Sequence, residues 1–260
     1  MILAQATASF LEFSTQNESG SQPQLQSLIH EASLRLVTEY FPRDADLSDI
    51  TPSSLRDFLT RCYLEKACSA SLSDCDSVEH DAVLKRTPSM DGSRATNDQA
   101  RLVSPSELMS TLSDFFVWAD DKAGVALSAE CATILRELQK TLPRALEISD
   151  ALARSLRRRG GGFTFPEFLT SFEEGGHSEY DIGPSGSVGA LEGYFRVIRV
   201  EGSSVEAEEL VSERRVWPII FPIDAAGVDE EYILNLEIVR TSEGWKIAGC
   251  GFAYPPGTEV

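Results

Sequence analysis

The stretch Ser155–Phe165, SLRRRGGGFTF, places three arginines before three glycines, and its composition suggests a phosphate or nucleic-acid contact. A phosphate-binding loop has the opposite order, because its glycines lead into a helix N-terminus and a Lys-Ser/Thr pair follows them. Arginines in the last turn of a helix instead complement its partial negative charge, and a following glycine takes a left-handed conformation. The stretch therefore predicts a helix that stops at Gly160.

Metal chemistry would need cysteines and histidines at ligand spacing. Cys68, Cys75 and His80 lie in one polar segment, but intervals of seven and five residues match no compact zinc pattern. His30 lies beside the apolar stripe of an expected helix, where we expect it to be partly exposed. The sequence therefore predicts no metal site.

Carboxylates and serines are the side chains that could do acid–base and nucleophilic chemistry. Asp120–Asp121 end an expected helix, and other acids line expected turns and strand edges: Glu206, Glu208, Glu209, Asp229, Glu230 and Glu231. Paired carboxylates do chemistry or hold Mg²⁺ only when they converge in a buried place, and in so acidic a chain we expect solvated charge. Ser185 in GPSGS lacks the strand–turn–helix context of a nucleophile elbow. We expect no catalytic set and no cofactor site.

Large apolar and thiol side chains are expected to build the core. Trp118, Trp217 and Trp245 are interpreted as core anchors and not as a ligand cage. Cys62 and Cys131 fall on apolar helical faces, which predicts buried thiols.

The charge of the chain bears on its partners. The 260 residues carry 41 acidic side chains against 23 lysines and arginines, a formal net charge of -18. A surface this negative repels nucleic-acid backbones and anionic membranes, so we expect neither as the main partner. Five cysteines without framework spacing predict free thiols in a cytoplasmic protein. The apolar N-terminus lacks the basic residues of a signal peptide, and no run reaches the length of a membrane helix.

The front half of the chain has the periodicity of helices. Apolar residues recur at three- and four-residue intervals between Leu25 and Tyr40 and in four later segments. Thr51 and Ser104 are expected N-caps, each followed by a proline, and Gly124 is an expected C-terminal stop. Ser128 is expected to cap a fourth helix, and Pro143 to separate it from a fifth.

The back half changes to a period of two. Five alternating segments joined by short turns predict an antiparallel meander that closes into a small barrel, with Pro218 at an edge or bulge. The sequence thus predicts an α+β protein with segregated domains. Its expected parts are a flexible N-terminus (1–22), a helical domain (23–174) with a disordered insertion (71–103), a linker (175–190) and a β domain (191–258).

Two segments resemble known families. The run from LSDITPSSLRDFL to LMSTLSDFFVWADDKAGV is similar to the helical core-binding half of tyrosine recombinases, but the catalytic half of that family has no counterpart here. The closing segment VRTSEGWKIAGCGF resembles the last hairpin of NTF2-like folds, which would imply a curved sheet cradled by helices.

Three hypotheses about function follow from these observations. The first is a non-enzymatic two-domain protein that acts by binding another protein. The second is an NTF2-like ligand pocket or enzyme in the C-terminal half. The third is DNA binding by the helical half.

Overall fold

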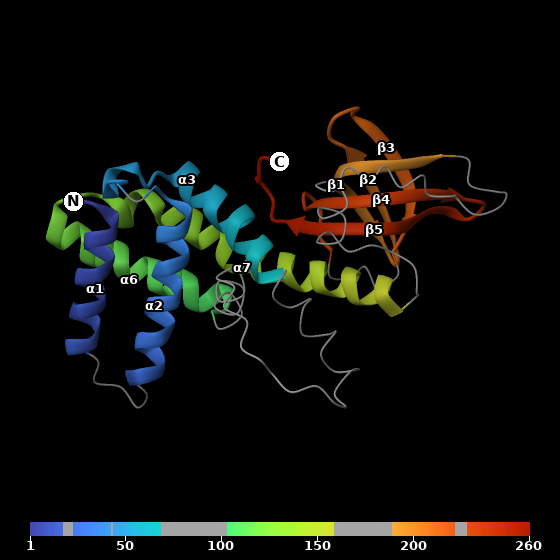
Figure 1. The fold of residues 1–260 in the computed structure, drawn as a ribbon. Helices are drawn as coiled ribbons and strands as arrows, with labels where there is room; N and C mark the ends of the chain where they lie inside the picture. The colour runs from blue at the N-terminus through green and yellow to red at the C-terminus, as the bar shows by residue number, and fades with distance from the viewer. Residues whose placement is uncertain (18–22, 43, 69–102, 159–188, 222–227) are drawn as a thin grey trace, which may run out of the picture. The chain divides into compact units, whose positions relative to one another are not determined.

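The computed structural model describes residues 1–17, 23–42, 44–68, 103–158, 189–221 and 228–260. The chain divides into two compact units, Met1–Pro143 and Arg144–Val260. The first is helical and the second contains a closed five-stranded barrel, so the predicted α+β class with segregated helices and strands is confirmed (Figure 1).

The helical unit is built from helices whose ends the local sequence specifies. Thr51 and Ser104 are N-caps as predicted and each forms a capping box, and Gly124 ends its helix in the left-handed conformation at φ 65°. Among the described helices, none is long and apolar enough to cross a membrane. The helices of this unit are α1 (Leu3–Asn17), α2 (Pro23–Tyr40), η1 (Leu47–Asp49), α3 (Pro52–Asp57), the π-helical turn η2 (Phe58–Tyr63), α6 (Pro105–Ala123) and the first half of α7 (Leu127–Arg158).

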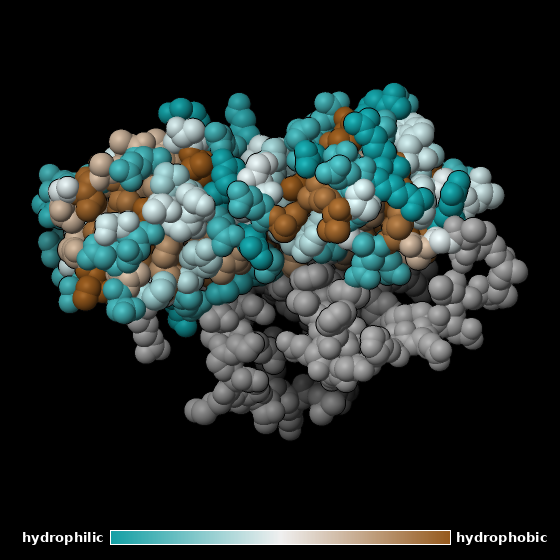
Figure 2. Space-filling view, turned by 90° about the horizontal axis from the view of Figure 1, so that it is seen from above, coloured by the Kyte–Doolittle hydropathy of each residue, from teal (hydrophilic) through white to brown (hydrophobic). Residues whose placement is uncertain are grey.

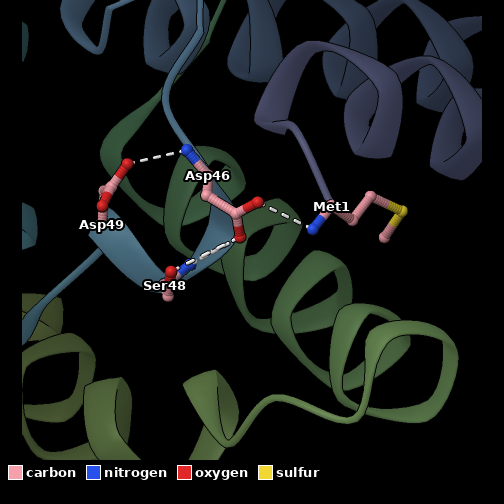
Figure 3. A network of polar contacts seen from close by, with 4 residues as sticks. All are labelled: Met1, Asp46, Ser48 and Asp49. Carbon is pink, nitrogen blue, oxygen red and sulfur yellow. Dashed lines mark hydrogen bonds and ion pairs between the residues drawn. The ribbon is translucent and has the colours of Figure 1, made fainter.

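The N-terminal segment differs from its prediction, because residues 3–17 form helix α1 where a flexible segment was expected. Leu3, Ala6 and Phe10 of this helix are buried, and Phe10 packs edge-on against Phe115 of α6. The Met1 amino group donates to Asp46 Oδ2 at 2.8 Å, beside the capping box that Asp46 forms with η1 (Figure 3). Apolar burial on one face orders this helix despite its polar residues.

Helix α7 also differs from its prediction, because it continues through Pro143 where two helices were expected. A proline inside a helix removes one backbone hydrogen bond and costs about 3 kcal/mol. Leu142 and Ala145, on either side of it, are fully buried. We infer that packing of both halves of α7 outweighs the local cost, which the sequence pattern alone does not reveal.

The C-terminal unit is a closed barrel in which β1 pairs with both β2 and β4. The spatial order is β1-β2-β3-β5-β4, and β3 and β5 run parallel, so the barrel is not the simple antiparallel meander that was expected. Ala248, Gly249 and Gly251 lie where β5 shifts register, as predicted for a bent strand. The strands are β1 (Ala190–Glu201), β2 (Ser204–Glu209), β3 (Arg214–Ile220), β4 (Ile233–Thr241) and β5 (Gly244–Tyr254).

The second half of α7 belongs to the barrel unit and lies along β5 (Figure 1). Strand β3 pairs with β5 at Trp245 and Lys246, and in the described part of the chain this pairing does not extend to the later residues of β5. There the Ala253 amide donates to Ser149 Oγ of α7 at 2.8 Å, and this hydroxyl in turn donates to the Ala145 carbonyl. A helix therefore covers the open edge of the strand.

We expect Ser149→Ala to lower the free energy of unfolding of the barrel unit by about 1–3 kcal/mol, because it leaves the buried Ala253 amide without an acceptor. Urea denaturation followed by circular dichroism measures this loss. The control is Thr15→Ala, which removes an exposed hydroxyl that bonds only carbonyls of its own helix, and should change stability by less than about 0.5 kcal/mol. Equal effects of the two substitutions would contradict the covering role of Ser149.

The remaining sequence predictions about domain limits concern segments that are mostly outside the described residues. Of the expected insertion at 71–103 only Val103 is described, and its carbonyl accepts a hydrogen bond from the buried Tyr63 hydroxyl at 3.0 Å. The expected linker at 175–190 is described only at Gly189 and Ala190, where β1 begins. Helix α7 is described as far as Arg158, so the predicted stop at Gly160 stays a prediction.

Candidate functional site

Among the described residues, the outer face of β1, β2 and β3 carries the feature best suited to binding. A register shift between β2 and β3 places Trp217 and Pro218 opposite the single residue Glu206. Such a bulge changes the alternation of the strand and re-aims its side chains. Trp217 is 40% exposed as a result, whereas its neighbours Val216 and Ile219 are buried in the barrel.

Arg199 of β1 fixes the indole of Trp217. Its guanidinium lies over the Trp217 ring, with Cζ 5.0 Å from the ring centroid. The same group contacts Glu206 Oε2 at 3.2 Å and Glu201 Oε1 at 2.8 Å. Arg199 is directly opposite Glu206 in the β1–β2 register. Two residues of β1, one of β2 and one of β3 build this cluster. A partly exposed tryptophan is thereby held in one orientation.

A second row of charged residues lies beside this cluster on the same three strands. Arg196, Glu208 and Arg215 are aligned across β1, β2 and β3, and Arg215 Nε is 4.0 Å from Glu208 Oε1. We call the two rows together the Trp217 face; it consists of Arg196, Arg199, Glu201, Glu206, Glu208, Arg215 and Trp217. Opposite charges balance on this face, although the chain as a whole is strongly acidic.

Elsewhere, exposed apolar side chains are scattered. Figure 2 shows one side of the molecule, where hydrophobic residues form small separate groups among hydrophilic ones. Phe13, Leu25 and Leu28 on α1 and α2 and Val211 in the β2–β3 turn are among the exposed large apolar residues. At Trp217, by contrast, an ion-paired arginine lies over the exposed ring.

The three tryptophans therefore differ in burial. Trp118 and Trp245 are buried, as expected for core anchors, but the same interpretation was wrong for Trp217. The sequence of β3 alone does not show that Trp217 faces outward, because the bulge at Trp217–Pro218 is set by pairing with β2. Pro218 was the only local signal of it, and its predicted bulge position is confirmed.

Of the cysteines and histidines of the helical unit that could serve metal or thiol chemistry, the structure describes Cys62, Cys68, Cys131 and His30. Cys131 is buried as predicted, Cys62 is half-buried, and burial raises the pKa of both thiols, that of Cys131 to about 11. His30 is buried beside Phe10, where partial exposure was expected. No group of three potential metal ligands occurs among the described residues, while Cys75, His80 and Ser185 lie outside them.

Asp120 has a structural partner that its sequence position did not reveal. Its carboxylate accepts hydrogen bonds from the Leu127 amide at 2.7 Å and the Ser128 amide at 3.1 Å, and from the Ser128 hydroxyl. Asp120 therefore caps the N-terminus of α7 from the preceding helix, and Ser128 is not the cap that was predicted. Favourable placement of a carboxylate at a helix N-terminus explains this contact.

Two of the strand carboxylates predicted to be solvated, Glu206 and Glu208, are paired with the arginines of the Trp217 face. A third, Glu209, accepts hydrogen bonds from two amides of the β2–β3 turn. These carboxylates therefore position the arginines of the Trp217 face and the β2–β3 turn, whereas the sequence indicated only solvated charge.

A polar cluster of the helical unit surrounds the π-helical turn. The Tyr40 hydroxyl donates to Asp57 Oδ2 at 2.5 Å, and burial together with Asp57 raises the tyrosine pKa to about 12. Arg61 and Lys66 pair with Asp57 and Glu39. The raised pKa keeps the Tyr40 hydroxyl a neutral hydrogen-bond donor near neutral pH, and the cluster's contacts tie α2 to α3 and η2.

Comparison with known proteins adds no assignment to this geometry. No protein-family model, no curated protein and no solved structure matches the chain.

Proposed function

We propose that this is a non-enzymatic two-unit protein that acts by binding another protein through the Trp217 face. The observation that carries the proposal is the 40% exposed indole of Trp217, held under Arg199 by two carboxylates. Tryptophan and arginine are the residues most enriched at the energetic centres of protein interfaces.

The fixed orientation of the indole supports this use of the face. A side chain that is already ordered loses little conformational entropy when a partner covers it. The arginines Arg199 and Arg215 are paired with carboxylates, so their charges are not available to neutralise a row of nucleic-acid phosphates. The balanced charge also limits repulsion of a partner of either sign.

The interior of the barrel supports this hypothesis over an NTF2-like pocket. A ligand pocket or active site needs a few convergent polar groups, whereas these inward positions of the barrel carry buried apolar side chains. These positions include Phe195, Val197, Val205, Ala207, Val216, Ile219, Leu234, Leu236 and Ile238. DNA binding by the helical half stays a separate prediction, tested by retardation of duplex DNA at low salt.

The test is photo-crosslinking in extract of the source cells. A benzophenone amino acid is placed at position 217 in one variant and at the exposed position 211 in another, and adducts are identified by mass spectrometry. We expect one recurrent protein adduct from position 217. Binding of that partner to Trp217→Ala should be about 30-fold weaker than to the unmodified chain, as for an interface centre worth about 2 kcal/mol.

Val211→Ala is the matched control, since it truncates a more exposed apolar side chain on the same barrel. It should bind the partner with unchanged affinity. The proposal fails if position 217 repeatedly yields no adduct above background, or if Trp217→Ala binds the captured partner as well as the control does.

A further inference from the structure

One end of the barrel is lined by charged side chains in place of the apolar ones that fill its interior. Inward positions alternate along each strand, and the register aligns Glu209 of β2 with Arg214 of β3, and Arg240 of β4 with Trp245 of β5. Each lies two residues beyond a buried inward residue of its strand, such as Ala207, Val216, Ile238 or Ile247. We call these four residues, Glu209, Arg214, Arg240 and Trp245, the barrel mouth.

Two arginines converge on one ring at this mouth. Arg214 Cζ and Arg240 Cζ each lie 5.8 Å from the centroid of the Trp245 ring. Trp245 is only 6% exposed, so its ring forms a floor beneath exposed guanidinium groups. Neither arginine has an ion pair with any described residue, whereas Arg199 has two, and Arg215 and Lys246 of the same barrel have one each.

Among the described residues, Glu209, the acidic residue of the barrel mouth, bonds the β2–β3 turn and has no ion pair with Arg214. Glu209 is opposite Arg214 in the register, yet its two carboxylate oxygens accept hydrogen bonds from the amides of Val211 and Ser212, at 3.0 and 2.7 Å. These bonds hold the pKa of Glu209 below its usual value, so the group stays ionised and engaged with the turn. A side chain at Gly193 would come within 3.2 Å of this carboxylate, and glycine leaves that space open.

We propose that the barrel mouth binds a phosphate group through Arg214 and Arg240. Two like charges directed at one ring repel each other, and an anion bound by both relieves that repulsion. A guanidinium binds phosphate or carboxylate oxygens through paired N–H donors. A phosphate monoester carries about two negative charges at neutral pH and balances both arginines, while a single carboxylate balances only one. Mouths of β-barrels are also frequent ligand positions.

The experiment titrates the full chain with inorganic phosphate, glycerol 2-phosphate and acetate at constant ionic strength, followed by calorimetry and by the indole N–H signals in NMR. Signals are assigned with single Trp→Phe variants. We expect saturable binding of the phosphate compounds and a shift of the Trp245 signal, with no shift for Trp118. Tighter binding of glycerol 2-phosphate would indicate an esterified ligand, and equal or tighter binding of inorganic phosphate would indicate the free ion; either supports a phosphate site.

The variants Arg214→Gln and Arg240→Gln should each weaken phosphate binding at least tenfold. Lys246→Gln is the matched control, because it removes a neighbouring cation of the same barrel whose partner is Glu243, and it should bind phosphate as the parent chain does. If a glutamine variant fails to fold, the NMR titration of the unmodified chain decides. The proposal is overturned by the absence of saturable phosphate binding, by a Trp245 signal that does not respond, by unchanged binding in folded Arg214→Gln and Arg240→Gln, or by acetate binding as tightly as phosphate.

Discussion

Gly244→Ala is expected to lower the free energy of unfolding of the barrel unit by about 3 kcal/mol. Gly244 begins β5 with φ at 133°, a conformation that residues with a Cβ rarely adopt. A Cβ built there lies 2.8 Å from the Pro218 carbonyl oxygen and 2.9 Å from its Cγ. Neither of these atoms belongs to a flexible chain end, so the β3–β5 contact itself would have to open.

The control for this substitution is Gly202→Ala in the β1–β2 turn. Gly202 also has a positive φ, of 58°, but no atom lies within 4 Å of a Cβ built there. We expect about 1 kcal/mol, the cost of the left-handed backbone alone. Urea denaturation followed by tryptophan fluorescence compares the two variants. A loss at Gly244 no greater than at Gly202 would show that the close approach of Pro218 does not contribute.

This contact also bears on the proposed function. Pro218 is the second residue of the bulge that exposes Trp217, and it packs against the residue that precedes Trp245. One local arrangement therefore joins the bulge of the Trp217 face to the strand that carries the floor of the barrel mouth. We expect a folded Gly244→Ala chain to be impaired both in partner binding and in phosphate binding.

Features determined by neighbouring residues in the chain could be predicted from the sequence. The N-caps at Thr51 and Ser104 and the stop at Gly124 depend on residues within three or four positions of one another. The five strands were recognisable because one face of each is buried, which imposes a period of two.

Features determined by distant residues could not be predicted in the same way. The parallel pairing of β3 with β5 joins segments about 25 residues apart, and no local pattern distinguishes it from a meander. Asp120 caps α7 across a turn, and the outward aim of Trp217 depends on how β2 pairs with β3. The candidate site was missed for this reason, since its four principal residues come from three strands and each is unremarkable in its own segment.

Because the chain divides into two units, we expect a core substitution in one unit to destabilise mainly that unit. Phe195 of β1 and Phe115 of α6 are both completely buried, one in each unit. Truncation of a buried phenylalanine to alanine costs about 3–5 kcal/mol, through lost apolar contact and the cavity left behind. We expect Phe195→Ala to destabilise the barrel unit by this amount and Phe115→Ala to do the same to the helical unit.

Hydrogen exchange measured by mass spectrometry locates each loss, since amides exchange through the opening of the structure that contains them. Phe195→Ala should accelerate exchange in β1 to β5 and leave α2 and α6 unchanged, and Phe115→Ala should give the reverse pattern. Helix α7 is left out of the comparison because it contributes to both units. Each variant is the other's control, being the same substitution at an equally buried site. Acceleration of all these elements by either variant would mean that the units unfold together, with α7 transmitting the loss through Pro143 as one cooperative helix.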